Sequence, residues 1–179
     1  MSQPILKLLV FSVALISLPV LAQDNTAGPG CGDPSAKFSV STNDPSKPSA
    51  QPDSGKALVF IIEDDSNFNS FPKPTTRAGV DRKWVGATHG NSWLSFSVDP
   101  GEHHLCASWQ TSVVLGKGKQ TSAAHFTAEP GGIYYFEVKN KFFQSQYGSV
   151  GEMTLDPLDS DEGQVLARKY HMVTSQPKN

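Results

Sequence analysis

The chain has 179 residues, and its 15 basic and 17 acidic side chains leave a formal net charge of −2. This balance lacks the strong electrostatic field of proteins that bind nucleic acid or anionic membrane surfaces. The two cysteines exclude a zinc module with four cysteine ligands. The length is sufficient for one domain with its own hydrophobic core.

The N-terminal segment, residues 1–22, has the features of a Sec-type signal peptide. Its apolar part follows a single basic residue, Lys7, and a run of about 15 residues is shorter than the roughly 20 that a membrane-spanning helix needs. Val20 and Ala22 place small side chains where a signal peptidase requires them if the cut precedes Gln23. We therefore expect cleavage between Ala22 and Gln23 and no stable membrane insertion of the mature chain. An uncleaved N-terminal anchor is the alternative.

Export changes how the cysteines are interpreted. Cys31 and Cys106 both lie in the mature part, and a cysteine pair in an oxidising compartment generally forms a disulfide. A lipid anchor on Cys31 is the alternative, but bacterial lipoboxes have a Leu-like residue at the position that Gly28 occupies here. We therefore predict a Cys31–Cys106 disulfide in a periplasmic or secreted protein without a lipid anchor.

Residues 23–55 have the composition of a flexible, proline-rich N-terminal arm. Within it, Lys37–Thr42 alternates side chains as a short strand does. The composition changes at Lys56–Ile62, which after its lysine is continuously apolar and rich in β-branched residues, as in a central strand buried on both faces. We expect this strand to open a domain over residues 56–172 and residues 173–179 to form a frayed tail.

After a long loop over residues 65–75, turn-forming residues recur about every 8–12 residues, as in antiparallel sandwiches and barrels. The segments between them predict strands over 77–80, 83–88, 92–98, 103–112, 121–128, 133–139 and 153–155. Asp159 and Glu162 have the spacing of a capping box, which predicts a short helix ending near His171 and weakened by Gly163. The predicted fold class is all-β, an antiparallel β-sandwich with a short C-terminal helix.

Four strings of the sequence resemble successive blocks of one bacterial family. They are Lys56-Ala57-Leu58-Val59-Phe60, Lys83-Trp84-Val85-Gly86, Asp99-Pro100-Gly101-Glu102-His103-His104-Leu105 and Glu129-Pro130-Gly131-Gly132-Ile133-Tyr134-Tyr135. In this order they resemble the exported domain-of-unknown-function family numbered twenty-eight forty-six, over residues 55–170. The resemblance implies an immunoglobulin-like β-sandwich and no established chemistry. The chain departs from the family at Arg82, where the family has Gly, which adopts a tight primed turn more readily.

Histidines are the candidate metal ligands. On a strand that starts at His103, this side chain faces the core side, whereas His104 and Cys106 face the other. A disulfide-bonded Cys106 cannot ligate a metal, so a zinc or copper site would need His104 with His125 or His89 from neighbouring strands. The alternative, which we adopt, is that His103 packs at the strand start and His104 faces solvent. We predict no metal and no cofactor.

A second candidate is a group of oxygen ligands. Glu63, Asp64 and Asp65 are consecutive, with Asn67 and Asn69 close behind, and such hard ligands could bind calcium. The spacing is not that of an EF-hand, however. Acids at the end of a strand usually form a solvated turn, which is the interpretation we favour.

Aromatic side chains are the third candidate. They lie in expected loops or beside serines on a strand face: Phe68, Phe71, Trp93, Phe142, Phe143 and Tyr147. If exposed, they would suit a protein or glycan partner. The alternative is that they plug the open ends of the sandwich.

The sequence contains no motif of acyl transfer or phosphate binding, so we predict that the protein is not an enzyme. We expect a non-catalytic binding or structural module of the bacterial envelope, whose partner is an envelope protein or a glycan. The alternative is a small metal- or ligand-binding enzyme that uses His104, His125 and His89.

Overall fold

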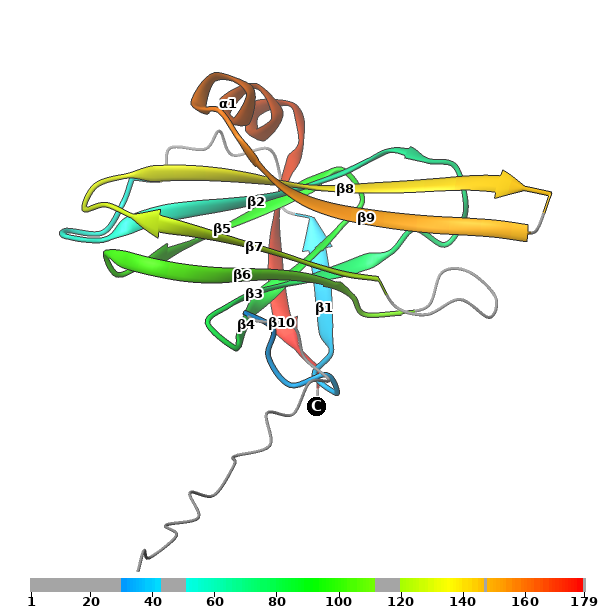
Figure 1. The fold of residues 1–179 in the computed structure, drawn as a ribbon, viewed down its shortest axis with the longest axis horizontal. Coiled ribbons are helices and arrows are strands. Elements are labelled where there is room, and N and C mark those ends of the chain that lie inside the picture. Colours follow the sequence, from blue (N-terminus) through cyan, green and yellow to red (C-terminus); the bar gives the residue numbers. More distant parts are fainter. Residues whose placement is uncertain (1–29, 43–50, 112–119, 147, 179) are drawn as a thin grey trace, which may run out of the picture.

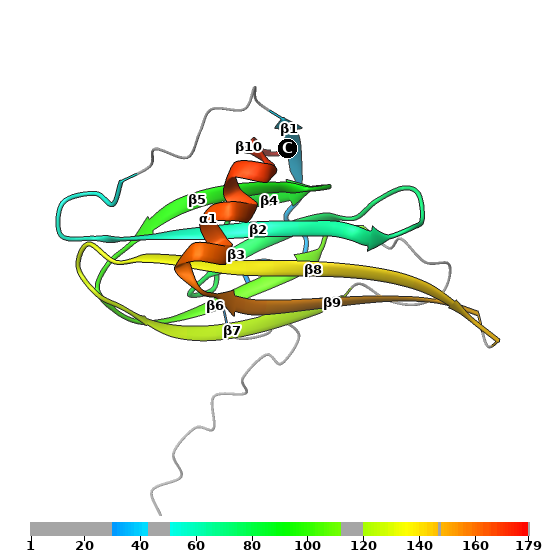
Figure 2. The same ribbon diagram turned by 90° about the horizontal axis from the view of Figure 1, so that it is seen from above.

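The computed structural model describes residues 30–42, 51–111, 120–146 and 148–178. In this part, two β-sheets face each other and one helix covers the outer face of the larger sheet (Figures 1 and 2). The prediction of an all-β sandwich with a short C-terminal helix is confirmed. The elements are β1 (Phe38–Thr42), β2 (Ala57–Phe68), β3 (Thr75–Val80), β4 (Lys83–His89), β5 (Ser92–Val98), β6 (Gly101–Trp109), β7 (Thr121–Ala128), β8 (Ile133–Ser145), β9 (Gly148–Leu158), α1 (Ser160–Lys169) and β10 (His171–Pro177).

The strand order differs from a simple antiparallel meander. The larger sheet has the order β1-β10-β5-β2-β8-β9 and the smaller sheet has the order β4-β3-β6-β7. Most neighbours are antiparallel, but β2 pairs parallel with β8 and β10 pairs parallel with β5. The expectation of a wholly antiparallel fold is therefore wrong at these two pairs. Between β2 and β8 the chain forms the strands of the smaller sheet and β5, and it then re-enters the larger sheet with β8 parallel to β2. Regularly spaced turns do not reveal such a crossover.

The strand β2 is buried on both faces, as predicted. Val59 and Ile61 face the core between the sheets, whereas Phe60 and Ile62 pack beneath α1. None of these side chains is more than 2% exposed. Both faces are covered because β2 lies in the middle of the larger sheet, with the smaller sheet on one side and the helix on the other.

Both β2 and the β8–β9 hairpin are longer than predicted. The strand β2 continues to Phe68, so the first residues of the expected loop over 65–75 belong to it. The strands β8 and β9 have 13 and 11 residues, and Phe142 and Phe143 therefore lie on a strand and not in a loop. The added length carries this hairpin toward one end of the molecule (Figures 1 and 2).

The C-terminal residues form a strand and not the frayed tail expected over 173–179. The strand β10 lies between β1 and β5, and Val173 is only 4% exposed. The segment is polar and lacks alternation, which is why a tail was expected. It is extended because β1 pairs along it from Val173 to Pro177, while β5 pairs at its start.

Part of the predicted organisation lies outside the described residues. This holds for the signal peptide over residues 1–22, for its cleavage site between Ala22 and Gln23, and for residues 23–29 and 43–50 of the arm. In the described part, no helix has the length and apolar character needed to cross a membrane.

A disulfide between Cys31 and Cys106 fixes the arm to the outer face of β6, as predicted. The predicted alternation of β6 is also confirmed, because Leu105 is fully buried in the core between the sheets. The arm lies so close to β6 that a Cβ on Gly30 would be 2.5 Å from the carbonyl oxygen of His104. The arm then leaves the smaller sheet and continues as β1, the edge strand of the larger sheet.

Arg77 of β3 holds the arm through its backbone. Its Nη1 atom donates hydrogen bonds of 2.9 Å to the carbonyl oxygens of Pro34 and Ala36. The guanidinium carbon lies 4.4 Å from the centroid of the Trp84 ring, and Trp84 Nε1 donates to the carbonyl oxygen of Asp33 at 2.6 Å. The position of the arm is therefore set by these contacts as well as by the disulfide.

The helix α1 begins as the capping pattern predicts. The side chain of Asp159 accepts a hydrogen bond of 2.9 Å from the backbone nitrogen of Glu162. Gly163, which we expected only to weaken the helix, faces β8 at a point where a Cβ would overlap the ring of Tyr135. The glycine therefore allows the close approach of α1 to the sheet.

Candidate functional site

The structure brings together two of the three candidate metal ligands. His104 and His125 are directly opposite each other on β6 and β7, with ring centroids 6.5 Å apart and exposed side chains. His89 lies at the end of β4, where its Nδ1 atom is 2.8 Å from the carbonyl oxygen of Pro74. This is the opposite end of the smaller sheet from His104. Among the described residues, no three His, Cys, Asp or Glu side chains are grouped so that they could hold a metal ion.

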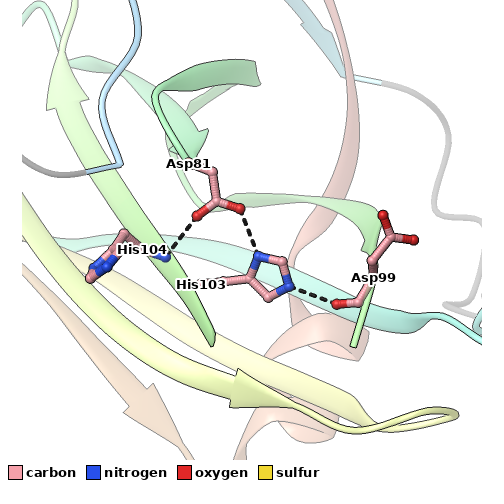
Figure 3. A network of polar contacts seen from close by, with 4 residues as sticks. All are labelled: Asp81, Asp99, His103 and His104. Atoms are coloured by element: carbon pink, nitrogen blue, oxygen red, sulfur yellow. Dashed lines mark hydrogen bonds and ion pairs between the residues drawn. The ribbon is translucent and has the colours of Figure 1, made fainter. Parts of the chain in front are cut away.

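The turn between β3 and β4 is fixed by the start of β6 (Figure 3). Asp81 and Arg82 have φ angles of 48° and 67°, the left-handed conformation of a two-residue primed turn. The turn is therefore tight although position 82 has Arg, where the family that the sequence resembles has Gly. Asp81 Oδ1 accepts a hydrogen bond of 3.0 Å from the backbone nitrogen of His104, and Asp81 Oδ2 lies 2.7 Å from His103 Nδ1. These contacts hold Asp81 in its unusual conformation.

Both ring nitrogens of His103 face acceptors. Nδ1 meets the Asp81 carboxylate, and Nε2 lies 2.6 Å from the carbonyl oxygen of Asp99. The ring satisfies both acceptors only as an imidazolium that donates twice. Burial lowers the pKa of His103, but the hydrogen bonds to Asp81 and Asp99 outweigh burial and raise it above its ordinary value. His103 is therefore a structural cation, because it has no free nitrogen with which to act as a general base.

Two acidic side chains of β2 are buried at one end of the core between the sheets. Glu63 and Asp65 are 0% and 1% exposed. Glu63 Oε1 and Asp65 Oδ1 each accept a hydrogen bond of 2.7 Å from Nδ2 of Asn140 on β8. Thr76 donates to Glu63 Oε1 at 2.7 Å, and Trp109 Nε1 donates to Asn140 Oδ1 at 2.9 Å. We call Glu63 and Asp65 the acid pair; its two carboxylates converge on one amide.

The other oxygen of each carboxylate in the acid pair is unpartnered. Glu63 Oε2 and Asp65 Oδ2 are buried and have no hydrogen-bond partner among the described residues. Burial, and then the charge of Asp65, raises the pKa of Glu63 well above its usual range, and burial also raises the pKa of Asp65. In the part of the chain that the structure describes, neither carboxylate forms an ion pair. Lys73 Nζ donates a hydrogen bond of 3.1 Å to the backbone oxygen of Asp65. Its positive charge therefore partly offsets the negative charge of the acid pair without contact with a carboxylate.

The residue between them, Asp64, faces the opposite side of the sheet. Burial alone would raise the pKa of Asp64, but hydrogen bonds, those from Ser66 above all, outweigh burial and lower it. On the same face, Glu137 forms an ion pair of 2.9 Å with Lys139. The carboxylates of the candidate calcium cluster are therefore divided between two faces of β2, so they do not form the candidate cluster. The expected solvated turn is also wrong, because β2 continues through these residues.

The acid pair lies at what we call the loop end of the molecule. This end comprises residues 69–74, which connect β2 to β3, residues 90–91 between β4 and β5, and the distal part of the β8–β9 hairpin. The parallel pairing of Phe68 with Phe142 brings the ends of β2 and β8 together there, and the Asp65 backbone nitrogen donates to the Asn91 side chain at 2.8 Å. Figures 1 and 2 both show the β2–β3 connection and the hairpin extending in this direction.

The candidate aromatic residues divide into exposed and buried ones. At the loop end, Phe71 is 85% exposed and Phe143 is 43% exposed. Phe68 instead packs against Trp109 and Phe142, and Trp93 is buried beneath α1. Tyr147 lies outside the described residues. Some of these rings therefore fill the core, and two face solvent.

Asn140 is not among the candidate residues named above, although the sequence carries a signal for its burial. Phe136, Val138 and Asn140 occupy alternate positions of one strand, and all three are buried in the core side of β8. A polar amide that continues an inward-facing apolar row needs a buried partner. The strand predicted over residues 133–139 stops one residue before Asn140, so Asn140 did not count as part of this inward-facing row.

Comparison with known proteins adds no relative. No family model, curated protein or solved structure matches the chain. The resemblance to the exported bacterial family accordingly stays a prediction, and function has to be inferred from the geometry of the site.

Proposed function

We propose that this protein is an exported, non-catalytic module of the bacterial envelope that binds another envelope protein through its loop end. The observation that carries this proposal is the exposure of Phe71 and Phe143 at the same end of a disulfide-linked sandwich. Apolar rings presented on a rigid scaffold are typical of protein interfaces. A phenylalanine has no polar group to pair with sugar hydroxyls, which favours a protein over a glycan as the partner.

Export is supported by the Cys31–Cys106 disulfide, since such bonds persist in oxidising compartments. The predicted signal peptide over residues 1–22 points the same way. We include in the proposal a periplasmic or secreted location, no lipid anchor, and membership of the family that the four sequence blocks resemble, with its immunoglobulin-like topology.

The arrangement of the histidines supports a binding role over catalysis. Both ring nitrogens of His103 are engaged, and His89 is remote from the pair formed by His104 and His125. The alternative of a metal enzyme built on these three side chains therefore lacks its third ligand.

Site-specific photocrosslinking in the native host tests the proposal. The photoreactive residue p-benzoylphenylalanine is placed at Phe71 or at Phe143, and as a control at Val165, which is 60% exposed on α1. We expect light-dependent adducts to one envelope protein from both positions at the loop end and none from Val165. Adducts of equal yield from all three positions, or no protein adduct from Phe71 and Phe143, would contradict the proposal.

A double variant then tests whether the rings supply binding energy. We expect Phe71→Ser/Phe143→Ser to lose affinity for the crosslinked protein. Its thermal stability should stay close to that of the wild type, because substitutions of exposed side chains usually change stability by less than about 0.5 kcal/mol.

A further inference from the structure

The acid pair takes part in a hydrogen-bond network that joins the two sheets at the loop end. Glu63, Asp65 and Asn140 belong to strands of the larger sheet, whereas Thr76 and Trp109 belong to strands of the smaller sheet. Thr76 donates to Glu63 Oε1 at 2.7 Å, and Trp109 Nε1 donates to Asn140 Oδ1 at 2.9 Å. The network therefore links the sheets across the core.

Two like charges would be crowded in this network if both carboxylates were ionised. Glu63 Oε1 and Asp65 Oδ1 each lie 2.7 Å from Asn140 Nδ2, so these two oxygens are no more than twice that distance apart. Both side chains are buried, and Glu63 Oε2 and Asp65 Oδ2 have no hydrogen-bond partner among the described residues. In such a poorly solvated place, carboxylates of like charge disfavour each other's ionisation. One proton on the pair removes this conflict.

The surrounding charges do not stabilise a doubly ionised pair. Burial raises the pKa of Asp65, and the nearby charges of Lys73 and His89 offset burial only in part. Lys73 and His89 each bond to a backbone oxygen and not to a carboxylate of the pair. Asp64, on the other face of β2, adds negative charge, and burial with the charge of Asp65 raises the pKa of Glu63 well above its usual range. The side chains that face the acid pair or its amide from β3, β5, β6 and β8 are neutral: Thr76, Ser92, Trp109 and Asn140.

We propose that the acid pair is a pH-sensitive link between the sheets, which holds one proton while it is closed and opens the loop end when this proton is lost to water. With the proton in place, the network carries one negative charge, which the donors Asn140 and Thr76 and the nearby Lys73 stabilise. Without it, two negative charges face one neutral amide, and local separation of the sheets lets water solvate both. This inference goes beyond the proposed function, because it does not depend on which partner Phe71 and Phe143 contact.

The direction of the pH effect follows from the raised pKa values of Glu63 and Asp65. In the unfolded chain, Asp and Glu have pKa values of about 4. The stability that the acid pair supplies is therefore complete below about pH 4 and is lost as pH rises through the folded-state pKa. A change of one unit in pKa corresponds to about a tenfold change in an equilibrium constant. We therefore expect the acid pair to lower the folding equilibrium constant at least about tenfold between acidic and mildly alkaline pH.

Urea unfolding of Glu63→Gln at about pH 4.5 and about pH 8.5 tests the link. Glutamine has the shape of a protonated glutamate and cannot ionise. We expect the folding equilibrium constant of this variant, divided by that of the wild type, to rise at least about tenfold between the two pH values. Groups that titrate in both proteins, such as His103, cancel in this ratio. Glu152→Gln, at an exposed position of β9, is the matched control and should keep the pH dependence of the wild type. A ratio for Glu63→Gln that is the same at both pH values would overturn the proposal.

Amide hydrogen exchange of the wild type tests whether the opening is local, and it needs no variant to fold. We expect the protection of residues 63–66 and 140–142, corrected for the intrinsic exchange rate, to fall at least about tenfold between about pH 4.5 and about pH 8.5. Low urea concentrations should hardly accelerate this exchange, because a local opening exposes little surface. Exchange of residues 57–60, at the other end of β2, should accelerate steeply with urea. Unchanged protection at the loop end, or the same urea dependence at both ends of β2, would overturn the proposal.

Discussion

His103 Nδ1 lies 2.7 Å from Asp81 Oδ2 and so ties the first residues of β6 to the turn between β3 and β4. The same carboxylate accepts from the backbone nitrogen of His104, and the Asp81 backbone nitrogen donates to the His104 carbonyl oxygen at 2.9 Å. A left-handed residue pair, Asp81 and Arg82, is thus held by a charge-assisted hydrogen bond.

The stability that this contact supplies should depend on pH. The pKa of His103 is raised, so its contribution is complete below about pH 6.5 and is lost as pH rises through the folded-state pKa. Burial raises the pKa of Asp81, but the bonds from His104 and His103 outweigh burial and lower it, so its contribution is complete above about pH 4 and is lost at lower pH. At pH values between about 4 and 6.5, Asp81→Asn should therefore lower the free energy of unfolding by about 1 kcal/mol. This value is modest because Asp81 is exposed.

Urea unfolding at pH 5.5 and pH 9 measures this difference. Asn tolerates a positive φ, so the variant keeps the turn and removes only the charge. Asp156→Asn, at an exposed position of β9, is the control and should show no such pH dependence. An equal loss for Asp81→Asn at both pH values would mean that His103 is not charged.

The disulfide should be the largest single covalent contribution to stability. The disulfide links residues that are 75 positions apart in the sequence. Replacement of both Cys31 and Cys106 by alanine removes this link, and we expect the free energy of unfolding to fall by roughly 2–5 kcal/mol. Denaturant unfolding of the oxidised protein, the reduced protein and the variant measures it. The reduced protein should match the variant, and identical unfolding of oxidised and reduced protein would refute the prediction.

Gly163→Ala should destabilise the protein although alanine favours helices by about 1 kcal/mol over glycine. The added Cβ would overlap the Tyr135 ring, and overpacking of this kind costs roughly 1–3 kcal/mol. Gln164→Ala, on the exposed side of α1, is the matched control and should be neutral or slightly stabilising. If both variants gain stability, α1 does not pack on β8 as described.

Val173→Ala tests whether the last strand belongs to the core. Val173 is 4% exposed and contributes to the core between the sheets, so we expect a loss of about 1–2 kcal/mol. Gln176→Ala, exposed on the same strand, should change stability by less than about 0.5 kcal/mol. Equal effects of the two substitutions would restore the interpretation of residues 173–179 as a tail.

Features that depend on local sequence were predictable. The alternation of β6 placed Leu105 inward and Cys106 outward, and the spacing of Asp159 and Glu162 located the start of α1, because both depend on residues a few positions apart. The disulfide was predictable for a different reason, since the chain has only one way to pair Cys31 with another cysteine.

The acid pair and β10 could not be predicted in this way. Glu63 and Asp65 resemble a solvated turn until Asn140 is brought to them across separations of 77 and 75 residues. The segment after His171 has no apolar period of its own and becomes a strand only beside β1. In both cases, the deciding partner lies far away in the sequence, and no local pattern reports its presence.

The position of β10 has a consequence for the order in which the fold can be completed. Since this strand is inserted between β1 and β5, a chain that is still being synthesised or translocated leaves the edge of β5 open and β1 without a neighbour. The larger sheet is completed only when β10 is available, so β10 has to be made before β1 can join this sheet. Until then, the open strand edge can pair with other chains, so β10 protects the sheet against misassembly.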